Sequence, residues 1–303
     1  MNKLSSYALL GLLFICNLAY AQNRNINSLK VLKDITVQCP NLIKSKKANE
    51  KIIDTLQVNT IYHGSTYTAF LDSRGGFYIL PKSKSTAENS YNGAIQLSIR
   101  HFYYNQKTKR SAARRVVKFL ETPAPLENPK SIKLKCELQN NVTHTLNIAF
   151  EDKAIIIENN TVDPSGLSPM TISHANLIFP PAFIIKEDSE WTKVKKSYSR
   201  SGIQLKGKNK KTFKYTESAN LSGHSSEASI KDYWKGRMID LEVLDGERTS
   251  PTFGIINYGN NPPMLSGFTL MLASTIRNNK SGSANKVKKS APLHPAKVKI
   301  IIK

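Results

Sequence analysis

Acidic residues, cysteines and long apolar runs are scarce in this chain of 303 residues. Three cysteines and 22 acidic residues stand against 44 basic ones, and the formal net charge is +22. No stretch reaches the roughly 20 apolar residues that a membrane-spanning helix needs. We therefore expect a protein that does not span a membrane and that is attracted to polyanions.

Linear catalytic motifs are also missing. The sequence has no G-x-S-x-G elbow, H-E-x-x-H helix, P-loop or dinucleotide-binding glycine pattern. The six histidines lack ligand spacing, so we expect neither a metal nor another cofactor. Asp240, Glu242, Asp245 and Glu247 could suggest a cation site, but their alternate spacing favours the solvated face of a strand that runs into a turn. The sequence thus gives no positive sign of an enzyme.

An export signal occupies residues 1–21. Lys3 precedes a short apolar run, and Ala19-Tyr20-Ala21 provides the small residues of a signal peptidase site. Cys16 does not fit a lipoprotein signal, because Ile15 stands before it instead of a small residue. We expect a mature protein that begins at Gln22 and is periplasmic or secreted.

Two cysteines, Cys39 and Cys136, remain after this cleavage. Because disulfides persist outside the cytoplasm, we expect the two to be bonded to each other. A free buried thiol and a metal ligand are the alternatives, and no CxxC motif or nearby histidine pair supports the second.

The hydrophobic pattern predicts a mainly β protein, an antiparallel β-sandwich. Short runs rich in Val, Ile, Thr, Tyr and Phe alternate with turn signals. Ser225 to Lys235 is the single helix candidate, with Ser225 as its cap and Gly236 as its stop. Strands are expected at residues 61–71, 77–80, 94–104, 114–120, 132–138, 143–150, 154–158, 237–244, 268–276 and 298–302.

The turn-rich segment 159–169 suggests a boundary between two β domains, 22–160 and 161–303. The second domain holds most of the lysine runs and a polar stretch at 277–295, which we expect to be a mobile loop.

The strongest basic concentration lies between residues 193 and 214 and contains no acidic residue. We expect a hairpin turn at 207–210, with aromatic residues placed to stack on bases or sugars. The alternative is that the aromatics pack inward and the lysines are only solvated or protect a strand edge. The candidate ligand-binding residues are Trp191, Lys193, Lys195, Lys196, Arg200, Lys206, Lys208, Lys210, Lys211, Lys214 and Tyr215.

A second basic cluster contains Lys109, Arg110, Arg114 and Arg115, and its arginines could clamp a phosphate or sulfate. A third follows Arg248, after which no acidic residue occurs, and includes Lys297, Lys299 and Lys303. Such a basic tail is typical of a solubilising segment.

Residues 36–150 resemble small exported bacterial domains of unknown function that have a Cys-Pro near the mature start and a second cysteine in a later strand. Cys39-Pro40, the stretch 67–77 and Leu134 to Leu138 carry the resemblance. It implies a disulfide-bonded β domain and no activity.

Together these features predict an exported protein that binds an anionic polymer or surface, such as lipopolysaccharide, a glycan or nucleic acid, through the 193–214 hairpin. A secreted hydrolase or toxin whose active residues meet only in three dimensions is one alternative. A structural subunit of an envelope assembly is another. The oligomeric state has no signature in the sequence.

Overall fold

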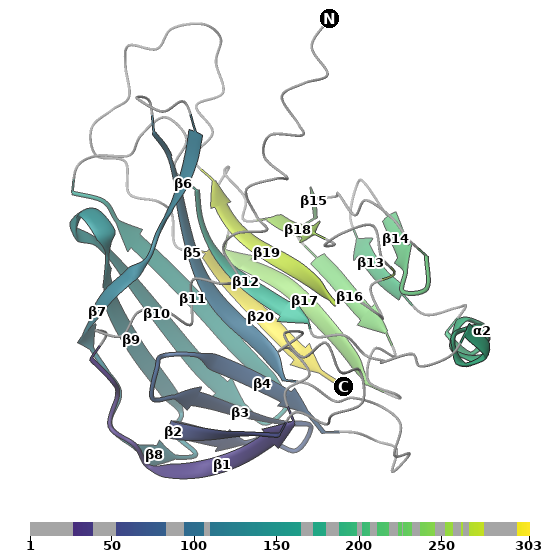
Figure 1. Cartoon of the computed structure of the whole chain (residues 1–303), viewed down its shortest axis with the longest axis horizontal. Helices are drawn as coiled ribbons and strands as arrows, with labels where there is room; N and C mark the ends of the chain where they lie inside the picture. The colour runs from purple at the N-terminus through teal and green to yellow at the C-terminus, as the bar shows by residue number, and fades with distance from the viewer. Residues whose placement is uncertain are drawn as a thin grey trace, which may run out of the picture.

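A computed structural model of the chain confirms the mainly β fold (Figure 1). It describes residues 27–38, 53–82, 94–105, 110–164, 172–179, 188–198, 202–206, 211–217, 224–225, 227–231, 237–245, 252–256, 262, 267–275 and 296–303. The predicted export signal and the predicted loop 277–295 fall outside these residues and stay predictions. Within the described part, no helix is long and apolar enough to cross a membrane.

The described strands form two sheets, which we call sheet A and sheet B. Every pair of neighbours is antiparallel except β2 with β8, which is parallel. Sheet A contains β1 (Lys33–Gln38), β2 (Ile53–His63), β3 (Tyr67–Asp72), β4 (Phe77–Pro81), β5 (Ile95–Asn105), β6 (Arg110–Arg114), β8 (Leu126–Glu127), β12 (Ile172–Phe179), β15 (His224–Ser225), β18 (Thr252–Ile256) and β19 (Phe268–Thr275).

Sheet B runs in the order β14-β13-β16-β17-β20-β11-β10-β9-β7. Its strands are β7 (Val116–Glu121), β9 (Ser131–Leu138), β10 (Val142–Glu151), β11 (Ala154–Val162), β13 (Gly202–Lys206), β14 (Lys211–Lys214), β16 (Glu227–Lys231), β17 (Met238–Asp245) and β20 (Ala296–Ile302). The helix α2 (Asp188–Ser197) lies outside both sheets (Figure 1), and the turn η2 (Gln139–Asn141) joins β9 to β10.

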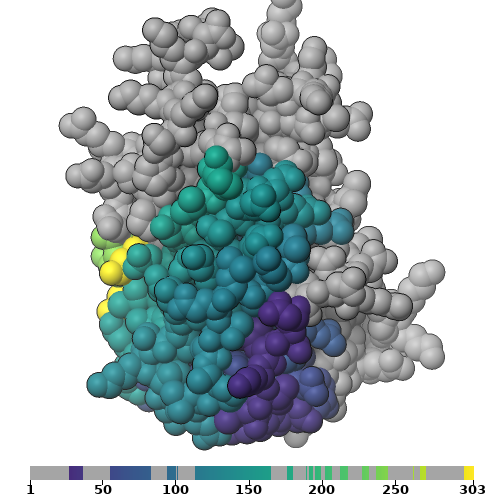
Figure 2. All heavy atoms as spheres, turned by 90° about the vertical axis from the view of Figure 1, so that its left-hand side faces the viewer, coloured from purple at the N-terminus to yellow at the C-terminus, as the bar shows by residue number. Residues whose placement is uncertain are grey.

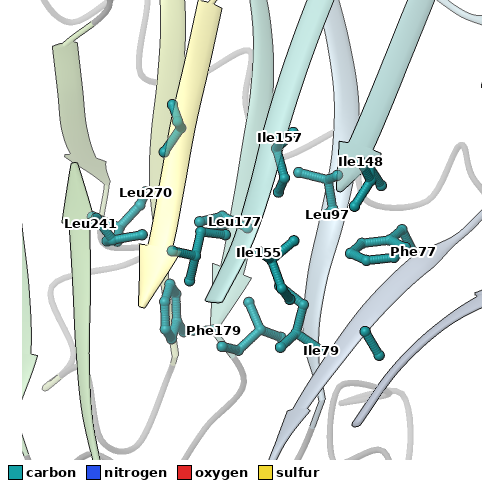
Figure 3. Close-up of a cluster of buried hydrophobic side chains, with 14 of the residues drawn as sticks. Phe77, Ile79, Leu97, Ile148, Ile155, Ile157, Leu177, Phe179, Leu241 and Leu270 are labelled. Carbon is teal, nitrogen blue, oxygen red and sulfur yellow. The ribbon is translucent and has the colours of Figure 1, made fainter. Parts of the chain in front are cut away.

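Alternation of apolar and polar residues gives each strand of sheet B an inner and an outer face. In β10 every second side chain from Val142 to Phe150 is buried, and the residues between them are half-buried. The inner faces of both sheets contribute to one hydrophobic core. Figure 3 shows this core, with Phe77, Ile79, Leu97, Leu177, Phe179 and Leu270 from sheet A and Ile148, Ile155, Ile157 and Leu241 from sheet B.

Two tight turns depend on residues that tolerate a positive φ. Gly75 adopts φ +80°, and a Cβ there would lie 2.4 Å from the Phe119 ring, so the position requires glycine on both counts. Asn140 and Asn141 adopt φ of 65° and 58° between β9 and β10. Tyr67 then links the two sheets, because its hydroxyl lies 2.7 Å and 2.9 Å from the backbone oxygens of Glu151 and Ala154.

The helix prediction is wrong. Residues 227–231 form β16, and the adjacent pair 224–225 forms β15. Ala228 and Ile230 are fully buried in the core through pairing with β13 and β17, and this tertiary packing outweighs the local helix signals. The helix forms instead at 188–197, within the basic segment. The strand expected at 61–71 is in fact the end of β2, a turn at 64–66, and β3.

The predicted boundary at 160/161 does not separate two sheets. In sheet A, β5 pairs with β12, and in sheet B, β11 pairs with the C-terminal β20. Residue 160 itself lies inside β11. Strands from both sides of the boundary therefore share each sheet and one core.

Candidate functional site

A cavity of about 620 Å³ opens on the outer face of sheet B. Its floor is formed by β9, β10, β11 and β20, and its wall by the segment that leads from β7 to β9. Figure 2 looks onto this side of the molecule, where the teal surface of residues near 110–165 is bordered by the yellow C-terminal strand.

The floor contains a row of polar side chains that the strand register places directly opposite one another. Lys133 of β9 is paired with Asn147 of β10, Asn147 with Glu158 of β11, and Glu158 with Lys297 of β20. Directly opposed residues on one face have Cβ atoms about 5 Å apart. Beside this row, Ala149 is paired with Ile156, which gives the floor an apolar strip.

The wall is a proline-containing segment that sheet A holds in place. Pro123, Leu126 and Pro129 line the cavity. Residues of β8 pair with β2, and the side-chain amide of Asn59 donates a hydrogen bond of 3.2 Å to the Pro123 carbonyl. The Asn128 backbone N–H donates one of 2.8 Å to Ile61. These contacts fix the wall against the floor.

Several charged residues around the cavity are in ion pairs. Lys133 lies 2.9 Å from Glu121 at the wall, and Lys299 lies 2.8 Å from Glu151. On the neighbouring β17, Asp240 is held by Lys303 at 2.8 Å and Lys206 at 3.7 Å. Burial acts to raise the pKa of Asp240, but hydrogen bonds from Lys303 and Ser229 outweigh it and the net shift is downward.

The centre of the floor differs from this paired surround. Asn147, Glu158 and Lys297 are half-buried and face the cavity. Among the described residues, none of the three side chains forms an ion pair or a hydrogen bond. The cavity thus presents one amide, one carboxylate and one ammonium group that have no partner in the described part of the chain, next to an apolar strip. Chemically, these groups can accept and donate hydrogen bonds and can exchange a proton.

The predicted ligand-binding residues lie on two separate elements, the helix α2 and the hairpin of β13 and β14. Lys193, Lys195 and Lys196 are exposed on α2, and the Lys195 ammonium lies 5.4 Å from the centre of the Trp191 ring. The hairpin of β13 and β14 is confirmed. Lys206 and Lys214 are paired with Asp240 and Glu217. Arg200, Lys208 and Lys210 lie outside the described residues, as does the side chain of Lys211.

The aromatic residues of this segment do not form a stacking surface. Tyr215 is fully buried, and Tyr198 and Phe213 are 6% and 5% exposed. All three belong to the hydrophobic core, against which Trp191 also packs. The alternative interpretation, in which the aromatics pack inward, describes them correctly.

The second basic cluster does not assemble as a clamp either. Arg114 points inward and lies 2.9 Å from Asp163, with side chains 6% and 1% exposed. Arg115 is exposed, whereas Lys109 and the side chain of Arg110 lie outside the described residues. The third cluster contributes Lys297 to the cavity, while Lys299 and Lys303 are in the ion pairs given above.

Cys136 is a free buried thiol, so the structure does not contain the predicted bond to Cys39, which lies outside the described residues. The side chain is on the inner face of β9 and belongs to the core. Burial raises the pKa of the thiol to about 12, so it remains protonated and acts as a small apolar residue. In the described part of the chain, no three His, Cys, Asp or Glu residues are grouped to hold a metal ion.

Asn147, Glu158 and the wall residues were missed by reasoning from the sequence. Their signal was the alternation in residues 131–137, 143–151 and 156–160, which marks an outer face but does not say which strands are neighbours. The pairing of β11 with β20 joins residues about 140 positions apart, and only the fold supplies it.

No family model matches the chain, and no curated protein matches its sequence. Among solved structures, a putative aldose 1-epimerase from Escherichia coli K12 is similar, with a TM-score of 0.38, 10% identity, and 80% of this chain and 98% of that chain covered. A galactose mutarotase related enzyme from Lactobacillus acidophilus has a TM-score of 0.37 and 9% identity, with 80% and 96% covered.

The burial of the aromatic residues and the pairing of Lys206 and Lys214 correct the interpretation of a polyanion-binding protein that acts through the 193–214 hairpin. The β-sandwich itself is established by the strand pairing of this chain, in two sheets that are antiparallel except for β2 with β8.

Proposed function

We propose that the protein binds a neutral carbohydrate in the cavity on the outer face of sheet B. The observation that carries the proposal is a group of three polar side chains, Asn147, Glu158 and Lys297, which lie side by side on the cavity floor and have no partner among the residues that the structure describes. Their charges cancel, because one carboxylate faces one ammonium. A ligand without net charge therefore fits better than an anionic polymer.

The chemistry of the lining supports a sugar. A sugar hydroxyl both donates and accepts hydrogen bonds, so it can satisfy an amide, a carboxylate and an ammonium in one small space. Ala149, Ile156, Pro123 and Leu126 offer apolar surface to the C–H face of a sugar ring. The volume lies within the range of about 300 to 1,000 Å³ that is usual for small-molecule sites.

Saturation-transfer difference NMR on the mature protein tests this proposal, with D-galactose, N-acetyl-D-glucosamine and cellobiose as probes. We expect transfer to at least one sugar, and a loss of about tenfold in affinity for Glu158→Gln, because a charge-assisted hydrogen bond contributes about 1.5 to 3 kcal/mol. Glu242→Gln is the matched control, since Glu242 is exposed on the neighbouring β17 and does not line the cavity. Absence of transfer to all three sugars, or equal losses in both variants, would contradict the proposal.

The same spectra carry a second readout. A carboxylate and an ammonium that face one ligand are also a base and an acid. Exchange between the two anomers of each reducing sugar is visible in the spectra, so faster exchange that Glu158→Gln abolishes would extend the function from binding to conversion.

A further inference from the structure

A second group of polar side chains lies inside the molecule, between the two sheets. It contains His101 of β5, Arg114 of β6, His144 of β10, Thr161 of β11, and Asp163 just beyond β11. Both histidine side chains are fully buried. They belong to facing sheets, and their rings are close enough to interact electrostatically.

The contact with Arg114 defines the protonation of His101. An Arg114 Nη1 atom lies 3.3 Å from His101 Nδ1 and donates a hydrogen bond of 2.9 Å to Asp163. A guanidinium group has no acceptor, so Nδ1 of His101 must accept, and the proton of the neutral ring is on Nε2. Protonating Nδ1 would place two donors against each other and break this contact.

His144 is held differently. Its Nδ1 atom lies 2.7 Å from the Thr161 hydroxyl, which can either donate or accept. Neither His101 Nε2 nor His144 Nε2 has a hydrogen-bond partner among the described residues. In either ring, once charged, the Nε2–H would be buried without an acceptor among the described residues. Two charged rings would also repel each other.

We propose that His101 and His144 form an acid-sensitive latch between the two sheets. When both rings are neutral, the sheets pack closely over them and the contact of His101 with Arg114 is intact. When either ring is protonated, a charge is placed in the core, for His101 directly beside Arg114, and the sheets must separate locally to hydrate it. Asp163 is the counter-charge at this position, but Arg114 already engages it. Cys136 lies opposite His144 on β9, and its thiol stays neutral.

The lowered pKa values of both histidines, which follow from burial and from neighbouring groups, support this latch. Burial, and then the charge of Arg114, lowers the pKa of His101 to about 4, although Asp163 acts against the shift. Burial, and then the proximity of His101, lowers the pKa of His144 to about 3. Unfolded histidine titrates near 6.5. Below pH 6.5 the unfolded chain therefore binds more protons than the folded one. The contribution of the two neutral rings to the free energy of unfolding is fully present above that pH and decreases as the pH drops toward 4.

Equilibrium urea unfolding of the mature protein between pH 7 and 4.5 tests the latch, with His101→Gln, His144→Gln and the control His63→Gln. Glutamine at position 101 keeps an oxygen that can accept from Arg114 but cannot be protonated. Near pH 5, each latch variant should take up about one proton fewer on unfolding than the wild type does. For each unit by which the pH is lowered, the unfolding equilibrium constant of the variant should therefore increase about tenfold less than that of the wild type. His63 is exposed on β2, so its variant should follow the wild type.

A second measurement covers the case in which a latch variant does not fold. In wild-type protein, the ring signals of His101 and His144 in proton NMR spectra should not titrate between pH 7 and 5. Titration of either buried ring near pH 6.5 would overturn the latch, as would an unchanged proton uptake in both folded variants.

Discussion

The basic segment 188–217 and the cavity on the outer face of sheet B differ in the surroundings of their lysines. In the segment 188–217, the lysines whose side chains the structure describes are exposed on α2 or paired on β13 and β14, while the aromatic residues between them pack in or against the core. On the outer face of β9, β10, β11 and β20, fewer lysines occur, but Lys297 stands beside Glu158 and Asn147 in a cavity. A high density of charge along the chain therefore marks solvated surface here, and the candidate site arises where distant strands bring unlike groups together.

The largest expected effect is on stability and comes from the aromatic residues of the basic segment. Tyr215→Ala should reduce the free energy of unfolding by about 3 to 5 kcal/mol, as large aromatic deletions in a core do. Urea denaturation measures it. Trp191→Ala, at a half-buried position on α2, is the comparison and should cost less. If Tyr215→Ala is as stable as the wild type, the aromatic residues are not core and the contrast fails.

The next effect is on ligand binding and comes from the apolar strip of the cavity. Ala149 is half-buried on the outer face of β10. Ala149→Trp should fill part of the cavity and reduce the affinity for a bound sugar about 100-fold, a loss of about 2.7 kcal/mol. Isothermal titration calorimetry measures it, and circular dichroism checks the fold. Full affinity in a folded Ala149→Trp variant would place the ligand elsewhere.

A smaller effect is expected on the inner face of β9, which packs in the core, and none on its outer face, which lines the cavity. Cys136→Ser should lower stability by about 1 to 3 kcal/mol, because it places a hydroxyl in the apolar core. Sugar binding should be unchanged, since Cys136 is on the face opposite the cavity. A reducing agent should not change the melting temperature of the wild type. A clear drop in melting temperature on reduction would instead restore the predicted bond to Cys39.

The smallest effect is expected from the charges of the basic hairpin. Lys206→Gln and Lys214→Gln remove exposed partners of Asp240 and Glu217, and such ion pairs contribute about 1 kcal/mol or less. Stability should change within that range, and sugar binding should not change at all. A loss of sugar affinity in this double variant would show that the two regions are not functionally distinct.

Reasoning from the sequence recovered most strands but not the site. Alternation from Val142 to Phe150 defined β10 and its outer face, and the asparagines at 140 and 141 marked the turn before it. This reasoning failed where tertiary contacts determine the secondary structure or the pairing of strands. Residues 227–231 are strand because β13 and β17 flank them, and Glu158 meets Lys297 because β20 returns to pair with β11. Local patterns carry no information on such long-range pairings.

The most direct test of the central claim is chemical-shift mapping of the mature, isotope-labelled protein with the sugar that shows the strongest saturation transfer. Our account predicts that the shifts concentrate on residues 121–133, 147–149, 156–158 and 297, and that the affinity is the same at low and high salt, because the ligand is neutral. Shifts concentrated on residues 193–214, or an affinity that falls steeply with salt, would contradict it.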